Sequence, residues 1–214
     1  MDIDADKIYQ VIKKRVDSAS TAELAIAAII GLGIFIGLFG GSKIQNAINT
    51  AKAEYAKWTF TETNVNAIPL LTKYWASVNL PLQPTSIAWS AAFISYIADN
   101  LLTSDQSHIG YARSAYRDRV NKVKGKYWAY KPSEISKVKK GDILIKRRSG
   151  SEASWNDVTS NTGFIPTHGD IVIEVTNAVA KTLGGNVSNS VSVTNYPLYG
   201  GKPGSDVFTI LRVS

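Results

Sequence analysis

The sequence predicts an α+β domain, and three observations lead to that class. Segments with apolar residues at helical spacing come first, up to about residue 102, and strand-like segments follow from about residue 126. Short turns separate the successive strand segments, which indicates an antiparallel sheet. The 214 residues are 44% apolar and 19% charged, which is typical of a chain that folds around a core.

The helices are predicted from apolar residues that recur three or four positions apart. Residues 43–58 form a polar connecting helix, and residues 68–78 form a second helix. A third helix over residues 88–102 has one strongly apolar face, made of Trp89, Phe93, Tyr96, Ile97 and Leu101. Thr85 and Ser86 are predicted to cap this helix, because hydroxyl side chains accept hydrogen bonds from the free N–H groups at a helix start.

The strands are predicted from short runs that are rich in β-branched residues and bounded by turn residues. They cover residues 141–146, 170–175, 180–183, 191–194 and 207–213. Helices that precede the strands, rather than alternate with them, indicate helices packed on one antiparallel sheet. The main domain is therefore expected to span residues 55–214.

Residues 1–54 are expected to form a separate N-terminal module. Residues 2–17 have the spacing of a short amphipathic helix, and residues 24–42 are 19 consecutive uncharged residues. That length just reaches a membrane span, and the five glycines in the run are tolerated better in membranes than in soluble helices. The segment is expected to insert into a membrane or to pack inside a larger assembly; a helix covered by the protein itself is the alternative.

The charge of the chain is basic and unevenly distributed, with 24 basic and 17 acidic residues and a net charge of +7. Between Arg113 and Arg148 there are 13 Lys or Arg residues but only three acidic ones, at positions 118, 134 and 142. Such a surface attracts nucleic acid, anionic lipid or an anionic cell-wall polymer, or it is simply solvated. No helix-turn-helix or zinc pattern accompanies it, so nucleic acid is expected only as a non-specific partner.

The chain has no cysteine and only two histidines, His108 and His168. Thiol nucleophiles, disulfides and cysteine-bound metals are therefore excluded, and any imidazole chemistry must use one of these two residues. We predict no metal and no cofactor.

Three polar residues stand where an acyl-transfer site would need them. Ser90 lies in the first turn of an apolar helix, His168 begins a strand, and Asn186 begins the next strand region. A hydroxyl nucleophile needs an imidazole base and an acceptor that orients the base, and a helix N-terminus offers N–H groups to an oxyanion. Asp170 competes with Asn186 as the orienting residue, because on a strand it shares a face with His168. The alternative for each residue is an ordinary turn or helix-end position.

The other histidine, His108, follows the Ser90 helix closely and could line the same groove; His168 is the preferred base. Tyr74 and Trp75 could also line the site, although a place in the core is the more ordinary interpretation.

The segment AWSAAFISYI resembles the motif that opens the catalytic helix of papain-like cell-wall hydrolases, the NlpC-like and CHAP amidase–peptidase superfamily. There a cysteine stands at the position of Ser90. The segments GDIL, HGDIVIEV and GGNVSNSVSV resemble, in the same order, the family's strand opening, its catalytic-histidine strand and the strand of its third polar residue. The resemblance covers about residues 60–214 and is nearest to an uncharacterised bacterial and phage branch that also has serine.

The resemblance implies a papain-like fold and a peptidoglycan hydrolase, either an amidase or an endopeptidase. It assigns Ser90 as the nucleophile, His168 as the base and Asn186 as the orienting residue. A second possibility is an inactive domain that serves as a structural or wall-binding part of a phage tail or secretion assembly. Either way, the protein is expected to face the cell envelope as a virion-associated, secreted or membrane-anchored component.

Overall fold

The structure is a computed structural model that describes residues 43–160 and 163–214. The predicted helix at 2–17 and the apolar segment at 24–42 lie outside these residues. Within the described part of the chain, no helix is long and apolar enough to cross a membrane. The described residues belong to one compact unit, which begins at Lys43.

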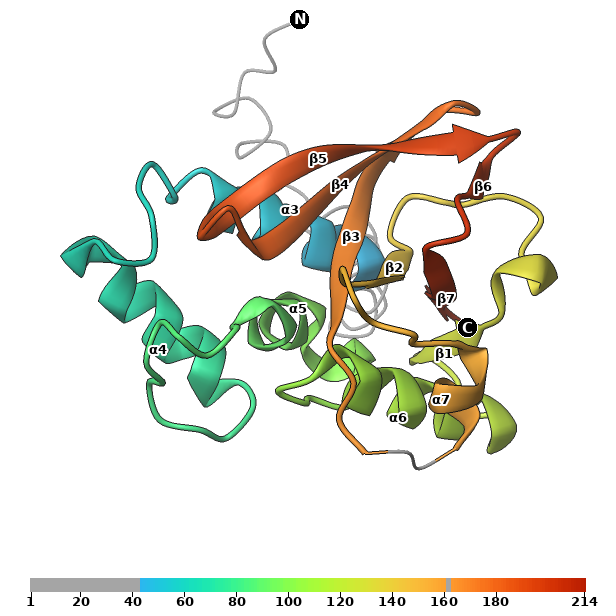
Figure 1. The fold of residues 1–214 in the computed structure, drawn as a ribbon, viewed down its shortest axis with the longest axis horizontal. Helices are drawn as coiled ribbons and strands as arrows, with labels where there is room; N and C mark the ends of the chain where they lie inside the picture. Colours follow the sequence, from blue (N-terminus) through green and yellow to red (C-terminus); the bar gives the residue numbers. More distant parts are fainter. Residues whose placement is uncertain (1–42, 161–162) are drawn as a thin grey trace, which may run out of the picture. The chain divides into compact units, whose positions relative to one another are not determined.

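The predicted α+β class is confirmed, and within residues 43–160 and 163–214 four helices precede the strand β1 (Figure 1). The helices are α3 (Lys43–Tyr55), α4 (Ile68–Ala76), α5 (Ser90–Ala98), α6 (His108–Val120) and α7 (Trp155–Thr159). Short 3-10 turns cover Val65–Ala67, Asp99–Leu101 and Pro132–Glu134. The strands are β1 (Tyr127–Tyr130), β2 (Ile143–Arg147), β3 (Thr167–Val175), β4 (Val179–Val187), β5 (Ser190–Tyr199), β6 (Lys202–Pro203) and β7 (Val207–Val213).

The strands form one antiparallel, seven-stranded sheet in the order β1-β7-β2-β3-β4-β5-β6. The sheet curls into a half-barrel, and β4 and β5 form a long hairpin across it (Figure 1). The strand β7 has the predicted bounds and lies between β1 and β2, so it connects the edge strand β1 to the rest of the sheet. The first strand, β1, was not predicted separately.

The two faces of the sheet carry different cores, because side chains alternate along each strand. Ile143, Ile145 and Ile171 pack into the large cluster that includes α3, α4, α5 and α6, and we call this side the helix face. Leu144 and Val172 pack into a smaller second cluster, and we call that side the opposite face. The pairing of Ile143 with Ile171 and of Leu144 with Asp170 fixes which residues share a face.

Helix α5 is the centre of the helix layer, and nearly all of its residues are buried. The predicted apolar face is confirmed for Trp89, Phe93, Ile97 and Leu101, which are all buried. The predicted extent and caps are wrong. The helix begins at Ser90 after Trp89, without a side-chain cap, and it ends before Asp99, whose φ of 44° turns the chain into a 3-10 segment.

Helix α3 belongs to the core and is more than a connector. Ala47, Ile48 and Ala51 are buried against the other helices. Its Glu54 is also buried, accepting hydrogen bonds from the Tyr74 hydroxyl (2.5 Å) and from Lys73 Nζ (2.6 Å). A buried carboxylate with these partners ties α3 to α4, because the pairing offsets the cost of its burial.

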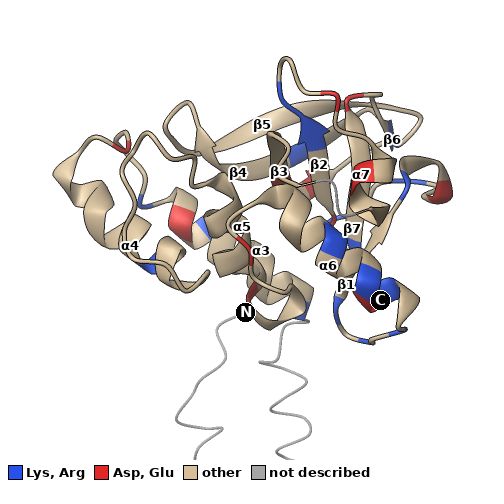
Figure 2. Ribbon diagram, turned by 60° about the horizontal axis from the view of Figure 1, so that its bottom comes forward, with Lys and Arg blue, Asp and Glu red and all other residues tan. Residues whose placement is uncertain are grey.

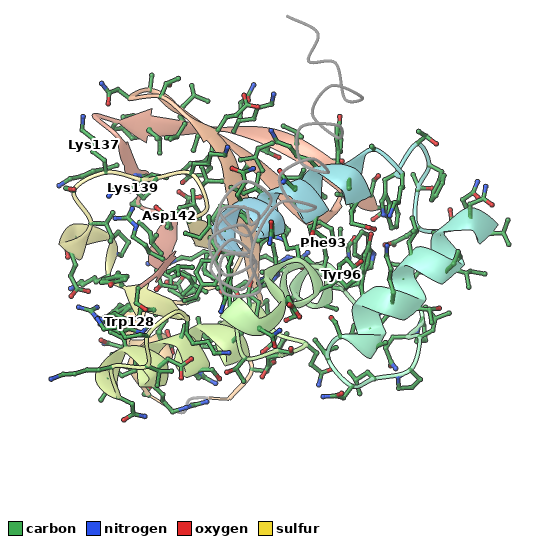
Figure 3. All side chains as sticks on the ribbon, turned by 180° about the vertical axis from the view of Figure 1, so that it is seen from behind. Phe93, Tyr96, Trp128, Lys137, Lys139 and Asp142 are labelled. Carbon is green, nitrogen blue, oxygen red and sulfur yellow. The ribbon has the colours of Figure 1, made fainter. Side chains whose placement is uncertain are left out.

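The loop before β2 is fixed by a second buried carboxylate, that of Asp142 (Figure 3). Asp142 accepts hydrogen bonds from Arg212 on β7, at 2.8 and 2.6 Å, and from the backbone N–H of Lys139 at 2.8 Å. The Gly-Asp opening of this strand is therefore structural.

Basic side chains gather on α6, on the turn after it and on β2 (Figure 2). Part of this charge is committed within the fold. Arg119 forms a bidentate pair with Glu134, and Arg212 pairs with Asp142. Lys122 and Lys124, in the turn after α6, are exposed.

Candidate functional site

Ser90 is the first residue of α5, and it is 2% exposed. The first helical N–H groups have no acceptor within the helix, and the first intrahelical bond in this turn runs from the N–H of Phe93 to the carbonyl of Trp89. The hydroxyl therefore stands beside N–H groups that favour negative charge. This part of the sequence prediction agrees with the structure.

An aromatic cluster fixes where α5 begins. Trp89 stacks on Trp58, with ring centroids 4.8 Å apart, and its Nε1 donates to Glu62 at 2.6 Å. The rings of Phe93 and the buried Tyr74 pack in a T-shaped arrangement, with centroids 5.3 Å apart. Aromatic pairs of this kind resist displacement, so the helix start that bears Ser90 is held firmly.

The imidazole next to Ser90 is that of His108, the first residue of α6. Its Nε2 lies 2.7 Å from Ser90 Oγ. Ser107 caps α6 by accepting the N–H of Gly110 at 3.0 Å, which fixes His108 at the helix start. The other ring nitrogen, Nδ1, hydrogen-bonds the hydroxyl of Tyr111. Ser90, His108 and Tyr111 thus form one continuous hydrogen-bonded cluster.

This cluster is uncharged near neutral pH. Burial lowers the pKa of His108 well below its usual value, and the nearby His168 lowers it further. Burial also raises the pKa of Tyr111 well above its usual value. A neutral imidazole retains a lone pair that can accept a proton, as a general base must.

A glycine on β3 makes room for the cluster. A Cβ atom at Gly169 would lie 2.6 Å from the Tyr111 hydroxyl oxygen and 2.7 Å from His108 Nδ1. The strand can approach α6 this closely only because position 169 has no side chain.

The second histidine, His168, belongs to a different cluster on the opposite face. His168 and Lys146 are cross-strand partners, and both reach the carboxylate of Asp170. His168 Nε2 donates to one oxygen and Lys146 Nζ donates to the other, each at 2.7 Å. Gly184 is packed against this carboxylate, since a Cβ there would lie 1.8 Å from Asp170 Oδ1.

This second cluster is ionic. Burial alone would raise the pKa of Asp170, but His168 and Lys146 outweigh burial and hold that pKa well below its usual range. The carboxylate is 1% exposed and is nevertheless charged. The two histidine rings are close, with centroids 5.5 Å apart, although their hydrogen bonds lead to opposite faces of the sheet.

The structure brings Ser90 together with His108, and His168 together with Asp170. Asn186 lies at a bulge of β4 with a left-handed backbone (φ 57°), where the register shifts between Gly184 and Val187. His168 bonds Asp170 and not this carboxamide. The sequence contained only a partial signal for His108: Ser107 is a typical capping residue, which predicts that His108 begins a helix.

A small hollow of about 60 Å³ opens at the Ser90 hydroxyl. It adjoins a larger groove of about 620 Å³, since both are lined by Ala88, Gln106, Ser107 and Phe164. Trp75, which is 1% exposed, contributes to the wall of the larger groove. Tyr74 is a core residue in the aromatic cluster.

Within residues 43–160 and 163–214, no three His, Asp or Glu side chains converge as the ligands of a metal ion would.

Comparison with known proteins gives one match. A bacterial protein family described as uncharacterized proteins conserved in bacteria (DUF2272) matches residues 52–202. No curated protein and no solved structure is significantly similar to the chain. The match covers most of the chain, so the protein belongs to this bacterial family.

Proposed function

Starting from membership of this bacterial family, we propose that the protein is a hydrolase that cleaves peptide or amide bonds of peptidoglycan, with Ser90 as the nucleophile and His108 as the base. The observation that carries the proposal is the 2.7 Å contact between Ser90 Oγ and His108 Nε2 at the start of α5. A serine hydroxyl does not ionise near neutral pH, so it reacts only when a base takes its proton during attack.

The first step is acylation. With the imidazole proton on Nδ1, directed to the Tyr111 oxygen, Nε2 accepts the Ser90 proton. Ser90 Oγ then forms a bond to the substrate carbonyl carbon, and the carbonyl oxygen becomes an oxyanion. The free N–H groups in the first turn of α5, at Ser90 and Ala91, are suitably placed donors for this charge.

The second step releases the products. The imidazolium of His108 gives its proton to the leaving amine, and the C–N bond breaks to leave an ester on Ser90. Water then attacks the ester, His108 takes the proton of that water, and the hydroxyl of Ser90 is restored. The burial of His108 disfavours the imidazolium and makes it a strong proton donor to the amine.

Two further features support the cell wall as the substrate. The motif order in residues 60–214 resembles that of papain-like wall hydrolases, and the basic surface around α6 suits an anionic polymer. We therefore propose a papain-like domain that works at the cell envelope, as a virion-associated, secreted or membrane-anchored protein. The apolar segment at residues 24–42 is the proposed contact with a membrane or with other subunits of an assembly.

The test is a digest of purified peptidoglycan by the full chain, with products identified by mass spectrometry. Ser90→Ala and His108→Ala are each expected to lower the rate about 10⁴-fold or more, because nucleophile and base act as a unit. Ser136→Ala, at an exposed serine away from the site, is the matched control and is expected to retain full activity.

A fluorophosphonate probe gives an independent readout, since it reacts with an activated serine. We expect a mass increase on the unmodified chain and none on Ser90→Ala. Peptidoglycan from several bacteria left intact, together with no probe adduct, would contradict the hydrolase. The inactive alternative, a structural or wall-binding part of a phage tail or secretion assembly, would then explain the fold better.

A further inference from the structure

Among the described residues that line the hollow at Ser90, one carries a permanent charge. Of the residues that line it, Arg148 carries a positive charge and none is acidic. His108 also lines the hollow, but burial lowers its pKa, so it contributes no charge near neutral pH. Arg148 follows β2 directly and is exposed.

The guanidinium of Arg148 is available to a ligand. Among the described residues, no side-chain hydrogen bond or ion pair engages it, whereas its neighbour Arg147 is held by the carbonyl groups of Ala153 and Ser205. Arg148 thus differs from Arg119 and Arg212, which are paired with carboxylates inside the fold.

The adjoining groove has no comparable free charge. Its floor is largely apolar, with Trp75, Ile87 and Ile109 among the lining residues. Its acidic residue, Asp105, is occupied by the N–H and hydroxyl of Ser107, at 2.8 and 3.0 Å. Its arginine, Arg113, donates to the carbonyl of Asp157 at 2.8 Å. A ligand that fills both spaces therefore meets one cation beside the reactive hydroxyl and apolar walls beyond it.

We propose that Arg148 is a specificity-determining residue that binds a free carboxylate of the substrate next to the scissile bond. The substrate class is then an acidic peptide or amide, in which the residue beside the cleaved bond carries an unmodified carboxyl group. Guanidinium and carboxylate groups match in geometry and form paired hydrogen bonds, which a carboxamide cannot reproduce. This inference rests on the proposed function and specifies its substrate.

The experiment compares two purified peptidoglycan fragments that differ only in a free carboxyl or a carboxamide beside the cleaved bond. The full chain is expected to prefer the carboxylate. Arg148→Ala is expected to lower kcat/KM on the carboxylate fragment about 10- to 100-fold, mainly through KM, and to leave the carboxamide fragment unchanged. Arg148→Lys should restore part of the loss. Arg117→Ala, at an exposed arginine of α6, is the matched control and should change neither.

Binding separates this inference from the hydrolase proposal. The Ser90→Ala protein is titrated with both fragments by calorimetry, with and without Arg148→Ala. If no fragment is cleaved but the carboxylate binds more tightly through Arg148, the hydrolase fails and the carboxylate site stands. If cleavage occurs and Arg148→Ala weakens both fragments equally, the carboxylate site is overturned and the hydrolase stands. If no fragment is cleaved and neither binds, both are overturned.

Discussion

Strand β3 separates two polar clusters that differ in charge. On the helix face, Ser90, His108 and Tyr111 form a buried cluster without charge. On the opposite face, His168 and Lys146 surround the ionised carboxylate of Asp170. The same residue type, histidine, stands in both clusters only 5.5 Å apart between ring centroids.

The difference between the clusters lies in what each histidine can do. Each ring nitrogen of His108 has a hydroxyl group as its hydrogen-bond partner. Nε2 can therefore accept the proton of the Ser90 hydroxyl while Nδ1 stays hydrogen-bonded to Tyr111. His168 is committed to a carboxylate that it helps to keep ionised. The comparison leads us to propose that the helix face carries the reaction, whereas the opposite face holds β2 and β3 together.

The largest expected effect separates the two histidines by activity. His108→Ala should slow peptidoglycan hydrolysis about 10⁴-fold or more, whereas His168→Ala should slow it less than about tenfold. We would compare the initial rates of hydrolysis by the two variants at a temperature where circular dichroism shows that both are folded. A loss for His168→Ala as large as that for His108→Ala would transfer the role of base to the opposite face.

The next effect separates the clusters by stability. Asp170→Ala should lower the free energy of unfolding by about 3–5 kcal/mol, because it leaves the charge of Lys146 without its buried partner. Glu134→Ala breaks a more exposed pair with Arg119 and should cost about 1 kcal/mol or less. Urea denaturation measures both. If both variants lost the same small amount of unfolding free energy, the cluster around Asp170 would not stabilise the pairing of β2 with β3.

Substituting alanine for either of two glycines adds one methyl group next to one cluster: Gly169 lies beside the cluster on the helix face, and Gly184 lies beside the cluster on the opposite face. Gly169→Ala and Gly184→Ala should each cost about 1–3 kcal/mol of stability, since each Cβ would collide with a cluster atom. Only Gly169→Ala should also reduce hydrolysis, because its Cβ meets His108 and Tyr111. The hydrolysis rates and melting curves of the two variants test this expectation. If Gly184→Ala alone lowered the rate, the reaction would have to be assigned to the opposite face.

The smallest effect is a pair of steps in stability against pH. The pKa of His108 is lowered in the fold, so the unfolded chain binds more protons and stability falls as pH drops below about 6.5. The pKa of Asp170 is also lowered, so its contribution persists until the pH falls below about 4. Each step has a slope of at most about 1.4 kcal/mol per pH unit.

Unfolding free energies measured from pH 8 to pH 3 resolve the two steps. His108→Gln should remove the upper step, and Asp170→Asn should reduce the lower step, to which the lowered pKa values of Glu54 and Glu134 also contribute. If the upper step survives in His108→Gln, the burial of that imidazole is not its cause.

The strands could be read well from the sequence, because their signal is local. The run from Val207 to Val213 is rich in apolar and β-branched residues and follows turn residues at 200–206, and β7 has those bounds. Helix α5 was predicted too long, since nothing local reveals that Asp99 adopts a positive φ. Its buried face was correct because it depends only on helical spacing.

The pairing within the site could not be read from the sequence in the same way. Ser90 was placed correctly because a helix start is a local feature. Which histidine meets it depends on how α6 packs against α5 and on the room left at Gly169, which are contacts between distant segments. Asn186 follows two glycines and lies at a bulge, where its left-handed backbone shifts the register between β4 and β5.

The place of β7 between β1 and β2 has a consequence for the order of folding. Its residues come last among the strands, yet they join β1 to β2, and β2 in turn holds β3. The connection between β1 and β2 cannot form until residues 207–213 have been made, whereas the helices and the strands β2 to β5 are made earlier. During synthesis the edge of β2 that later pairs with β7 is therefore unpaired, and unpaired strand edges favour aggregation. Loss of this one strand would split the sheet and leave β1 without a partner.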